Sequence, residues 1–183
     1  WKLAAVLSGD APATLLNSYS DERCHGSAEN ILNSSRATNF MTPKTPIEAL
    51  FRNEVLNLAE THPFARKLIN SGRLSQPCSL HGMPLQSGDH PLVGQSLIDA
   101  PLGDGWLVEQ AQGAFTLLSI GGAAPQIDGI RPLHVDHPAP ELARRYGTGH
   151  YLIRPDGHIC AHFDSPDRDQ ITAAMARAKG QHP

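Results

Sequence analysis

The residues best suited to chemistry include three that alternate along one short segment near the C-terminus. His158, Cys160 and His162 are spaced by two positions, so on an extended strand their side chains would point to the same side. Imidazole and thiolate groups are common zinc ligands. However, four residues at roughly 3.3 Å each spread the outer two over about 13 Å, too far for all three to reach one ion. The pattern therefore favours a structural role over a metal site.

A second pair of histidines, His134 and His137, is followed directly by Pro138. Paired zinc ligands at short spacing usually share one face of a helix. Because the proline interrupts regular structure here, we expect the pair to straddle a strand end and a loop. We therefore assign no metal to these residues.

The cysteines do not form a recognisable redox or metal motif. Cys24, Cys78 and Cys160 are odd in number and widely spaced, which argues against a disulfide framework and a Cys-x-x-Cys motif and favours a reducing cytoplasm. We expect Cys24 to be a small buried hydrophobe and Cys78 to lie in a loop. A redox-active thiolate would be expected just after the strand predicted at 115–120, but the sequence there is Gly-Gly-Ala-Ala-Pro, at 121–125.

Composition and charge exclude several partners. Fifteen basic and 18 acidic residues leave a net charge of −3 with no block of like charge, so we expect no nucleic-acid or anionic-membrane binding. No stretch approaches the roughly 18 to 20 apolar residues that cross a bilayer, and the apolar run 3–7 is too short for a signal peptide. We therefore expect a soluble protein with small, weakly charged partners.

Helical patterns occupy the first 70 residues. A short helix ends at Gly9, and a second runs from about Asp10 past Arg23 to about Leu32. Thr45 to Glu48 has the arrangement of a capping box with proline at the first helical position, so a third helix follows. Its apolar positions predict one buried face, made of Ile47, Leu50, Phe51, Val55 and Leu58.

Beyond this segment the pattern becomes mostly β. Glycine and proline recur through 71–90, which we interpret as a linker. Strands are predicted at 106–108, 115–120, 131–135, 151–154 and 158–163, with a Pro-Asp-Gly turn at 155–157, and helices near 139–146 and after Ser165. Trp106 is expected to anchor the core. The fold class is thus α/β (α+β), with a helical segment at 1–70 and a thioredoxin-like domain without Cys-x-x-Cys at 91–183.

Two parts of the chain resemble a known family, one at its start and one made of three later segments. Trp1 to Gly9 with Leu15 to Arg23 is similar to the Trp-Lys-Leu-Ala … Gly … Leu-Leu-x-Ser-Tyr-x-x-Glu-Arg pattern of FAD-dependent aromatic-ring hydroxylases, which include phenol, hydroxybenzoate and hydroxyphenylpropionate hydroxylases. In this pattern we expect Glu22 and Arg23 to form only local ion pairs. Three later stretches look like the thioredoxin-like C-terminal extension of one branch: Ser71 to Ser75, Gly113 to Leu118 and Tyr151 to His158.

The resemblance implies that an intact parent protein binds FAD, reduces it with NADH or NADPH, forms a flavin C4a-hydroperoxide and hydroxylates an aromatic small molecule. The family binds FAD through an N-terminal Gly-x-Gly-x-x-Gly turn and a later Gly-Asp pair upstream of the Trp-Lys helix. Neither occurs at a matching place here. We therefore assign no catalytic, cofactor-binding or metal residue to this chain and expect no cofactor bound to it.

Because Trp1 begins inside a predicted helix, we interpret the chain as a C-terminal fragment of such a monooxygenase, with a structural or dimerisation role as a homodimer. A stand-alone thioredoxin-like interaction module without redox activity is the alternative. A thioredoxin- or peroxiredoxin-like redox enzyme depending on Cys160 is a weaker third possibility.

Overall fold

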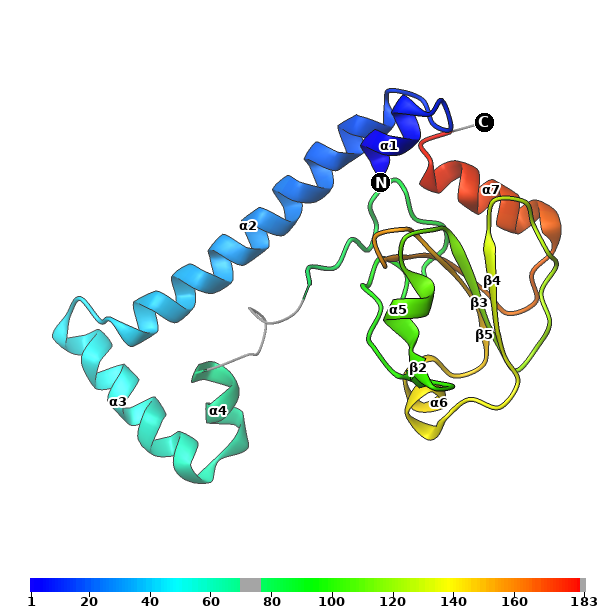
Figure 1. Ribbon diagram of the computed structural model, residues 1–183. Helices are drawn as coiled ribbons and strands as arrows, with labels where there is room; N and C mark the ends of the chain where they lie inside the picture. The colour runs from blue at the N-terminus through cyan, green and yellow to red at the C-terminus, as the bar shows by residue number, and fades with distance from the viewer. Residues whose placement is uncertain (70–76, 182–183) are drawn as a thin grey trace. The chain divides into compact units, whose positions relative to one another are not determined.

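The computed structural model describes residues 1–69 and 77–181 (Figure 1). These residues form two compact units, one made of Trp1–Glu22 with Ser79–Pro183 and the other of Arg23–Cys78. The resemblance noted at Ser71 to Ser75 lies outside the described residues. Each unit is described by itself below.

The first unit is built on a four-stranded mixed sheet. Its strands are β3 (Thr116–Ile120), β4 (Arg131–Val135), β5 (Gly149–Ile153) and β6 (Ile159–Phe163), in the order β4-β3-β5-β6. β3 and β4 are parallel, whereas β5 is antiparallel to both β3 and β6. The four strands that the sequence predicts between 115 and 163 are thus present, and the α+β class is confirmed.

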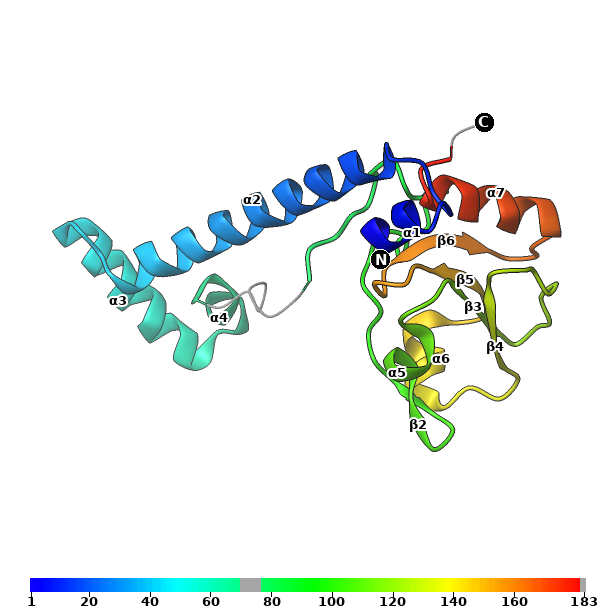
Figure 2. The same ribbon diagram turned by 45° about the horizontal axis from the view of Figure 1, so that its top comes forward.

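Helices cover both faces of this sheet (Figure 2). α5 (Leu107–Ala111) and α6 (Pro140–Tyr146) pack on one face, and α7 (Arg168–Ala178) packs on the other. Every residue of β3 and β5 is buried, as expected for strands covered on both sides. The core on the α7 face is formed by Phe115, Leu117, Ile127, Ile130, Leu152, Cys160, Ala161, Ile171, Ala174 and Ala178.

Local sequence signals explain where these elements begin. Pro140 occupies the first turn of α6, where its missing N–H is not needed. Asp167 caps α7, because its side chain accepts a hydrogen bond from the Gln170 N–H at 2.7 Å. Gly157, at φ 81°, closes the turn between β5 and β6 and donates its N–H to the Arg154 carbonyl at 2.9 Å.

The two edges of the sheet differ. The outer edge of β6 is covered by the strap 87–97, in which Ser87 N–H bonds to the Cys160 carbonyl and Gly94 N–H bonds to the Ile159 carbonyl, each at 2.8 Å. β4 is the other edge strand. The Arg131 N–H bonds to the Phe115 carbonyl, on the side of β4 that faces β3. Because N–H groups alternate between the two sides of a strand, the next residue, Pro132, lies where an N–H would point away from the sheet. Proline is tolerated at such a position.

The prediction of a strand at 106–108 is wrong, since a helix begins at Leu107. A two-stranded hairpin of β1 (Pro101–Leu102) and β2 (Gly105–Trp106) leads directly into α5. Leu107 and Ala111, which are four residues apart, are both buried against the sheet. The packing of this helical face therefore overrides the strand preference of the local residues. Trp106 remains 49% exposed and is not a core anchor.

The second unit is helical. α2 (Leu15–Met41) enters it from the first unit and runs further than the predicted Leu32, followed by α3 (Pro46–Thr61) and α4 (Pro63–Ile69). The predicted capping box is confirmed: Glu48 N–H donates to Thr45 Oγ1 at 3.2 Å, and Thr45 N–H donates to Glu48 Oε2 at 3.0 Å. Among the described residues, no helix has the length and apolarity needed to span a membrane.

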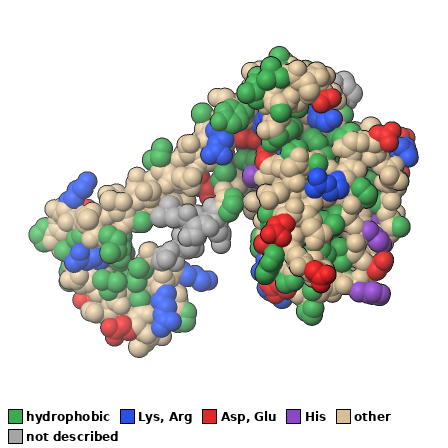
Figure 3. Space-filling model, viewed as in Figure 1, with side chains coloured by type: hydrophobic (Ala, Val, Ile, Leu, Met, Phe, Trp, Pro, Cys, Tyr) green, Lys and Arg blue, Asp and Glu red, His purple; other side chains and the backbone are tan. Residues whose placement is uncertain are grey.

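The buried face predicted for α3 is wrong in most positions. Only Val55 of the five is buried, whereas Ile47 is 78% and Phe51 is 58% exposed. The helical period correctly identifies an apolar face, but burial also requires a surface to cover it. The helices α3 and α4 thus carry an exposed set of large apolar side chains, part of which is visible in Figure 3: Ile47, Leu50, Phe51, Leu56, Leu58, Phe64 and Leu68.

Candidate functional site

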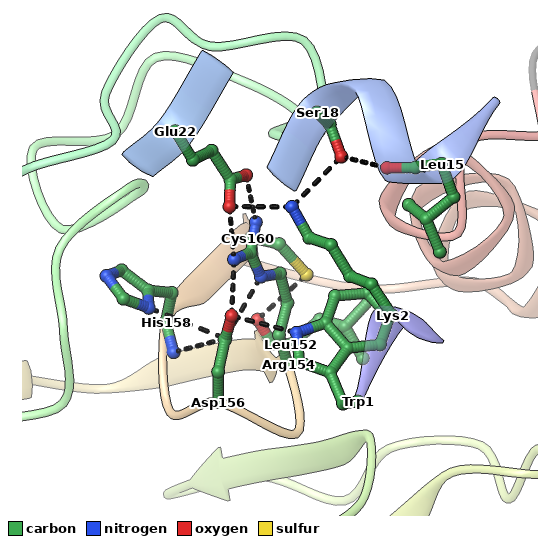
Figure 4. A network of polar contacts seen from close by, with 10 residues as sticks. All are labelled: Trp1, Lys2, Leu15, Ser18, Glu22, Leu152, Arg154, Asp156, His158 and Cys160. Atoms are coloured by element: carbon green, nitrogen blue, oxygen red, sulfur yellow. Dashed lines mark hydrogen bonds and ion pairs between the residues drawn. The ribbon is translucent and has the colours of Figure 1, made fainter. Parts of the chain in front are cut away.

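The two stretches that resemble the flavin hydroxylases meet in one polar cluster of the first unit (Figure 4). Its centre is Arg154, which directly follows β5 and is fully buried. Arg154 Nη1 and Nη2 donate to the two carboxylate oxygens of Glu22 at 2.7 and 3.0 Å. Arg154 Nε and Nη2 donate to the two oxygens of Asp156 at 3.1 and 2.5 Å. One guanidinium therefore makes two bidentate contacts, the geometry for which arginine is best suited.

A buried lysine completes the ion pairs. Lys2 Nζ donates to Glu22 Oε2 at 2.7 Å and to Ser18 Oγ at 2.9 Å. Ser18 in turn donates to the Leu15 carbonyl at 2.6 Å. Ser18 and Glu22 are four residues apart on α2, so they lie on the same helix face and both reach Lys2.

Trp1 closes the cluster from the side. Its indole Nε1–H donates to Asp156 Oδ2 at 2.9 Å, and its ring lies edge-on to Phe115 with 5.6 Å between centroids. The Arg154 guanidinium carbon is 5.5 Å from the ring centroid, within cation–π range. We refer to Trp1, Lys2, Glu22, Arg154 and Asp156 as the ion-pair clamp.

The clamp is balanced in charge. Burial opposes ionisation of its carboxyl groups, yet the hydrogen bonds from Arg154 and Lys2 prevail and hold the pKa of Glu22 below its usual value. The pKa of Asp156 is held far below its usual range, because contacts with His158, Arg154 and Trp1 outweigh burial. Burial lowers the pKa of Lys2, partly offset by Glu22. Two cations therefore face two ionised carboxylates.

This arrangement is suited to holding the chain together and not to proton transfer. A general acid or base works best with a pKa near the operating pH, but the pKa values of Glu22 and Asp156 move away from neutrality. Every charged oxygen and nitrogen of the pairs is directed at another member of the clamp. We therefore interpret the clamp as the structural link between Trp1–Glu22 and the β5–β6 hairpin.

Sequence reasoning missed this cluster. The prediction that Glu22 forms local ion pairs next to Arg23 is wrong, since its partners are Lys2 and Arg154. The sequence contained one indication of it. Each of the two parts that resemble the family carries a basic and an acidic residue, Lys2 and Glu22 in the first and Arg154 and Asp156 in the second. Spacing within one stretch says nothing about a contact between residues 132 positions apart.

The three candidate metal ligands near the C-terminus do not share one face, since His158 precedes β6 and only Cys160 and His162 lie on it. The pairing of β5 with β6 shifts between Leu152 and Ile153, which makes Cys160 the extra residue of a β-bulge. Cys160 joins the core on the α7 face, whereas the His162 ring lies 4.8 Å from Tyr151, in the core on the other face. The strict alternation assumed from the sequence is therefore wrong here.

His134, the first histidine of the other candidate pair, has an acidic partner of its own. His134 Nε2 lies 2.8 Å from Asp136 Oδ1. Within residues 1–69 and 77–181, no group of three or more histidine, cysteine, aspartate or glutamate side chains is arranged to hold a metal ion.

The cysteines lie in three different environments. Cys24 is exposed, contrary to the buried position expected for it, because its side of α2 is not covered. Cys78 is half-buried, and its Sγ would lie 2.7 Å from a Cβ added to Gly26. Burial raises the pKa of the Cys160 thiol to about 12, so this group is not a thiolate at neutral pH.

Most of the known proteins that resemble this chain in sequence are named as monooxygenases or hydroxylases, and one is named a dialkyldecalin synthase. No family model matches the chain. A 12-dehydrotetracycline 5-monooxygenase/anhydrotetracycline 6-monooxygenase of Streptomyces rimosus is 30% identical over 175 residues, which cover 87% of this chain and 33% of that protein. An uncharacterized aromatic compound monooxygenase of Bacillus subtilis is 29% identical over 181 residues, covering 93% of this chain and 36% of that protein.

Solved structures agree with this. The anhydrotetracycline hydroxylase OxyS from Streptomyces rimosus is 27% identical with a TM-score of 0.65, covering 100% of this chain and 39% of that one. The rebeccamycin biosynthetic enzyme RebC with reduced flavin has a TM-score of 0.69 at 20% identity over the whole of this chain and 39% of that one, a likeness of fold. The chain spans about a third of the length of the curated relatives it matches. The homologues of this chain are monooxygenases of the FAD-dependent aromatic hydroxylase family, and the chain is similar in sequence and in fold to the C-terminal part of such proteins.

Proposed function

We propose that this chain is the C-terminal part of a FAD-dependent, NAD(P)H-using monooxygenase that hydroxylates an aromatic compound, and that this part has a structural role. The observation that carries the proposal is the ion-pair clamp, in which the two stretches resembling the family are joined by a buried arginine. The relatives support the activity of the parent, since their names describe monooxygenases of 12-dehydrotetracycline and anhydrotetracycline and of rifampicin.

The residues of this chain do not fit a flavin site. Its sequence has no Gly-x-Gly-x-x-Gly turn, which brings the pyrophosphate of a dinucleotide close to the start of a helix. The nearest pattern, Gly103-Asp104-Gly105, lies in the β1–β2 hairpin and precedes a helix of only five residues. We therefore propose that FAD and the nicotinamide cofactor bind elsewhere in the parent and derive no catalytic step in this chain.

We keep the three-part division of the chain as a proposal: 1–70 as a helical segment, 71–90 as a linker and 91–183 as a thioredoxin-like domain. The strand order β4-β3-β5-β6, with β3 and β4 parallel and the other pairs antiparallel, supports the thioredoxin-like assignment. The division needs one refinement, because residues 1–22 belong to the same compact unit as the C-terminal part, to which the ion-pair clamp joins them.

We also propose that the apolar face of α3 and α4 is covered by the FAD and substrate region of the parent. Seven large apolar side chains are exposed along 22 residues, from Ile47 to Leu68. Exposed apolar patches of this kind mark interaction sites. The relatives are about three times as long as this chain, which supports a covering region within one polypeptide.

The decisive experiment begins with the sequence encoded upstream of Trp1. We expect a Gly-x-Gly-x-x-Gly turn at a strand-to-helix junction there, and we expect the extended protein to be purified with bound FAD and to oxidise NADH or NADPH in the presence of an aromatic substrate. The 183-residue chain serves as the matched control and should bind no flavin. An upstream region without that turn, or an extended protein without flavin, would overturn the proposal.

The alternative is a stand-alone interaction module, and the same exposed face of α3 and α4 favours it. The homodimer predicted for the fragment stays a proposal, and self-association is compatible with this alternative too. Light scattering after size-exclusion chromatography distinguishes the two, when the 183-residue chain is compared with the extended protein. Self-association that is lost in the extended protein would indicate a face normally covered by the parent, whereas a dimer in both would support a dimerisation role. A location in a reducing cytoplasm stays a prediction from the three cysteines, all of which are free thiols.

A further inference from the structure

A second site lies in the first unit and shares no residue with the clamp. It is a pocket of about 600 Å³ lined by the loop 88–91, the end of α6, and residues of β5 and β6. This volume is within the range of small-molecule sites, roughly 300–1,000 Å³. The lining residues that matter for recognition are Asp89, His90, Tyr146, Tyr151, His162 and Asp164.

One side of the pocket is a series of aromatic rings. The imidazoles of His90 and His162 stack with 3.9 Å between centroids and an interplanar angle of 21°. The Tyr151 ring is 4.8 Å from His162 and 5.7 Å from Tyr146. Gly149 permits this arrangement, because a Cβ at that position would lie 2.7 Å from His162 Nε2.

The phenols of this wall are not available to a ligand. Tyr151 Oη donates to the Tyr146 carbonyl. Tyr146 Oη donates to the Ile98 carbonyl at 2.7 Å and accepts the Ile98 N–H at 2.8 Å. Burial raises the pKa of both tyrosines, that of Tyr146 to about 12. The tyrosines therefore contribute neutral rings, whose faces carry partial negative charge.

The charges around the pocket are negative. Asp89 and Asp164 are both exposed, and both residues belong to the lining. No lysine or arginine is among the described lining residues. Burial and the neighbouring His90 lower the pKa of His162, so its imidazole is uncharged at neutral pH. A ligand in this pocket meets π-faces and carboxylates but no fixed positive charge.

We propose that this pocket binds a flat organic cation, which stacks on the half-buried His90 ring at the outer end of the His90–His162 stack and directs its positive charge towards Asp89 and Asp164. Aromatic faces and carboxylates both attract cations, and a planar molecule can extend the existing stack. A metal ion does not fit, since the described side chains offer no group of three ligands. The proposal concerns this unit alone and does not depend on the activity of the parent.

The test uses the full 183-residue chain and two planar probes, N-methylquinolinium as the cation and quinoline, which is uncharged at pH 8, as its neutral counterpart. Calorimetry should give an affinity for the cation on the order of tenfold higher than for quinoline. In two-dimensional NMR, the amides of Tyr151 and His162 should shift on addition of the cation.

The matched variants are Asp89→Asn/Asp164→Asn and the control Asp104→Asn/Asp128→Asn, which removes the same charge at exposed positions outside the pocket. We expect the first double variant to lose affinity for the cation by about tenfold and the control to bind as the unchanged chain does. Equal binding of both probes, equal loss in both double variants, shifts confined to other residues, or no binding at millimolar N-methylquinolinium would each overturn the proposal.

Discussion

Arg154 Nη1 lies 2.7 Å from Glu22 Oε1, although 132 positions separate the two residues in the sequence. The side chain of Arg154 is fully buried and that of Glu22 is 9% exposed. This contact joins the two stretches by which the chain resembles its family. Its removal should therefore affect the whole first unit.

Replacing Glu22 with glutamine should lower the free energy of unfolding by about 3–5 kcal/mol, because Arg154 and Lys2 would then be buried without a full counter-charge. Chemical denaturation followed by circular dichroism measures this. The matched control is Glu141→Gln, which removes a carboxylate that also accepts from two arginines, Arg144 and Arg145, but at the surface. We expect little change in the control, and equal effects of the two substitutions would contradict a buried clamp.

The stability of the first unit should fall in acid. Because the folded chain holds the pKa values of Glu22 and Asp156 below their usual values, both stay ionised where the unfolded chain is already protonated. Their contribution is fully present above about pH 5 and is lost as the pH falls below about 4 towards the folded pKa values. Unfolding free energies measured from pH 7 to pH 2 should show a flatter profile for Asp156→Asn. Parallel profiles for this variant and the unchanged chain would argue against the predicted linkage.

The indole N–H of Trp1 should contribute separately from its ring. Trp1→Phe keeps an aromatic ring against Phe115 but removes the donor to Asp156. We expect a loss of about 1–3 kcal/mol, as for a hydrogen bond to a charged group. Trp106→Phe is the matched control, since that side chain is half exposed, and should change stability by less than about 0.5 kcal/mol. The prediction fails if the two variants unfold at the same denaturant concentration.

Gly94 should tolerate no side chain. It has a φ of 84°, and a Cβ there would lie 2.3 Å from the backbone nitrogen of His81. Gly94→Ala should therefore detach the strap 87–97 from β6 and destabilise the unit strongly. Gly82→Ala is the control, because Gly82 has a similar φ of 77° but open space around it, so it carries only the backbone strain of about 1–2 kcal/mol. Hydrogen exchange of the Ile159 amide, which bonds to the Gln95 carbonyl of the strap, is compared in the unchanged chain, in Gly94→Ala and in Gly82→Ala. Exchange should become faster only in Gly94→Ala, and equal exchange rates in the two variants would contradict the prediction.

The cysteines should differ in reactivity. Cys24 is exposed, whereas Cys160 is buried with its pKa raised to about 12. Alkylation of the native chain followed by mass spectrometry should label Cys24 and leave Cys160 unmodified until a denaturant is added. Labelling of Cys160 at the rate of Cys24 under native conditions would reopen the thioredoxin- or peroxiredoxin-like interpretation.

Local signals predicted the elements of the fold well. The capping box at Thr45, the turn before Gly157 and the strands around β3 and β5 each depend on residues close together in the sequence. The errors arose where burial depends on distant partners. The apolar face of α3 would be buried only if another surface covered it, and Trp106 would be buried only if the core extended to its position. The bulge at Cys160 follows from the pairing of β6 with β5.

The candidate site was less predictable than the fold. The resemblance drew attention to Trp1 to Arg23 and to Tyr151 to His158, but it gave no reason for them to touch. A single sequence contains no information on pairs of charges that compensate each other across 132 positions. The pocket was missed for a similar reason, since His90, Tyr151 and His162 come from three separate segments.

The contact between Glu22 and Arg154 also sets an order of events during synthesis. The ribosome adds about 5–20 residues per second, so on the order of ten seconds pass between the synthesis of Glu22 and the synthesis of Arg154. Until then the nascent chain carries Trp1, Lys2 and Glu22 without their partners, and the segment 1–22 cannot take its final place in the first unit. The N-terminal residues of this chain are therefore among the last to reach their final environment.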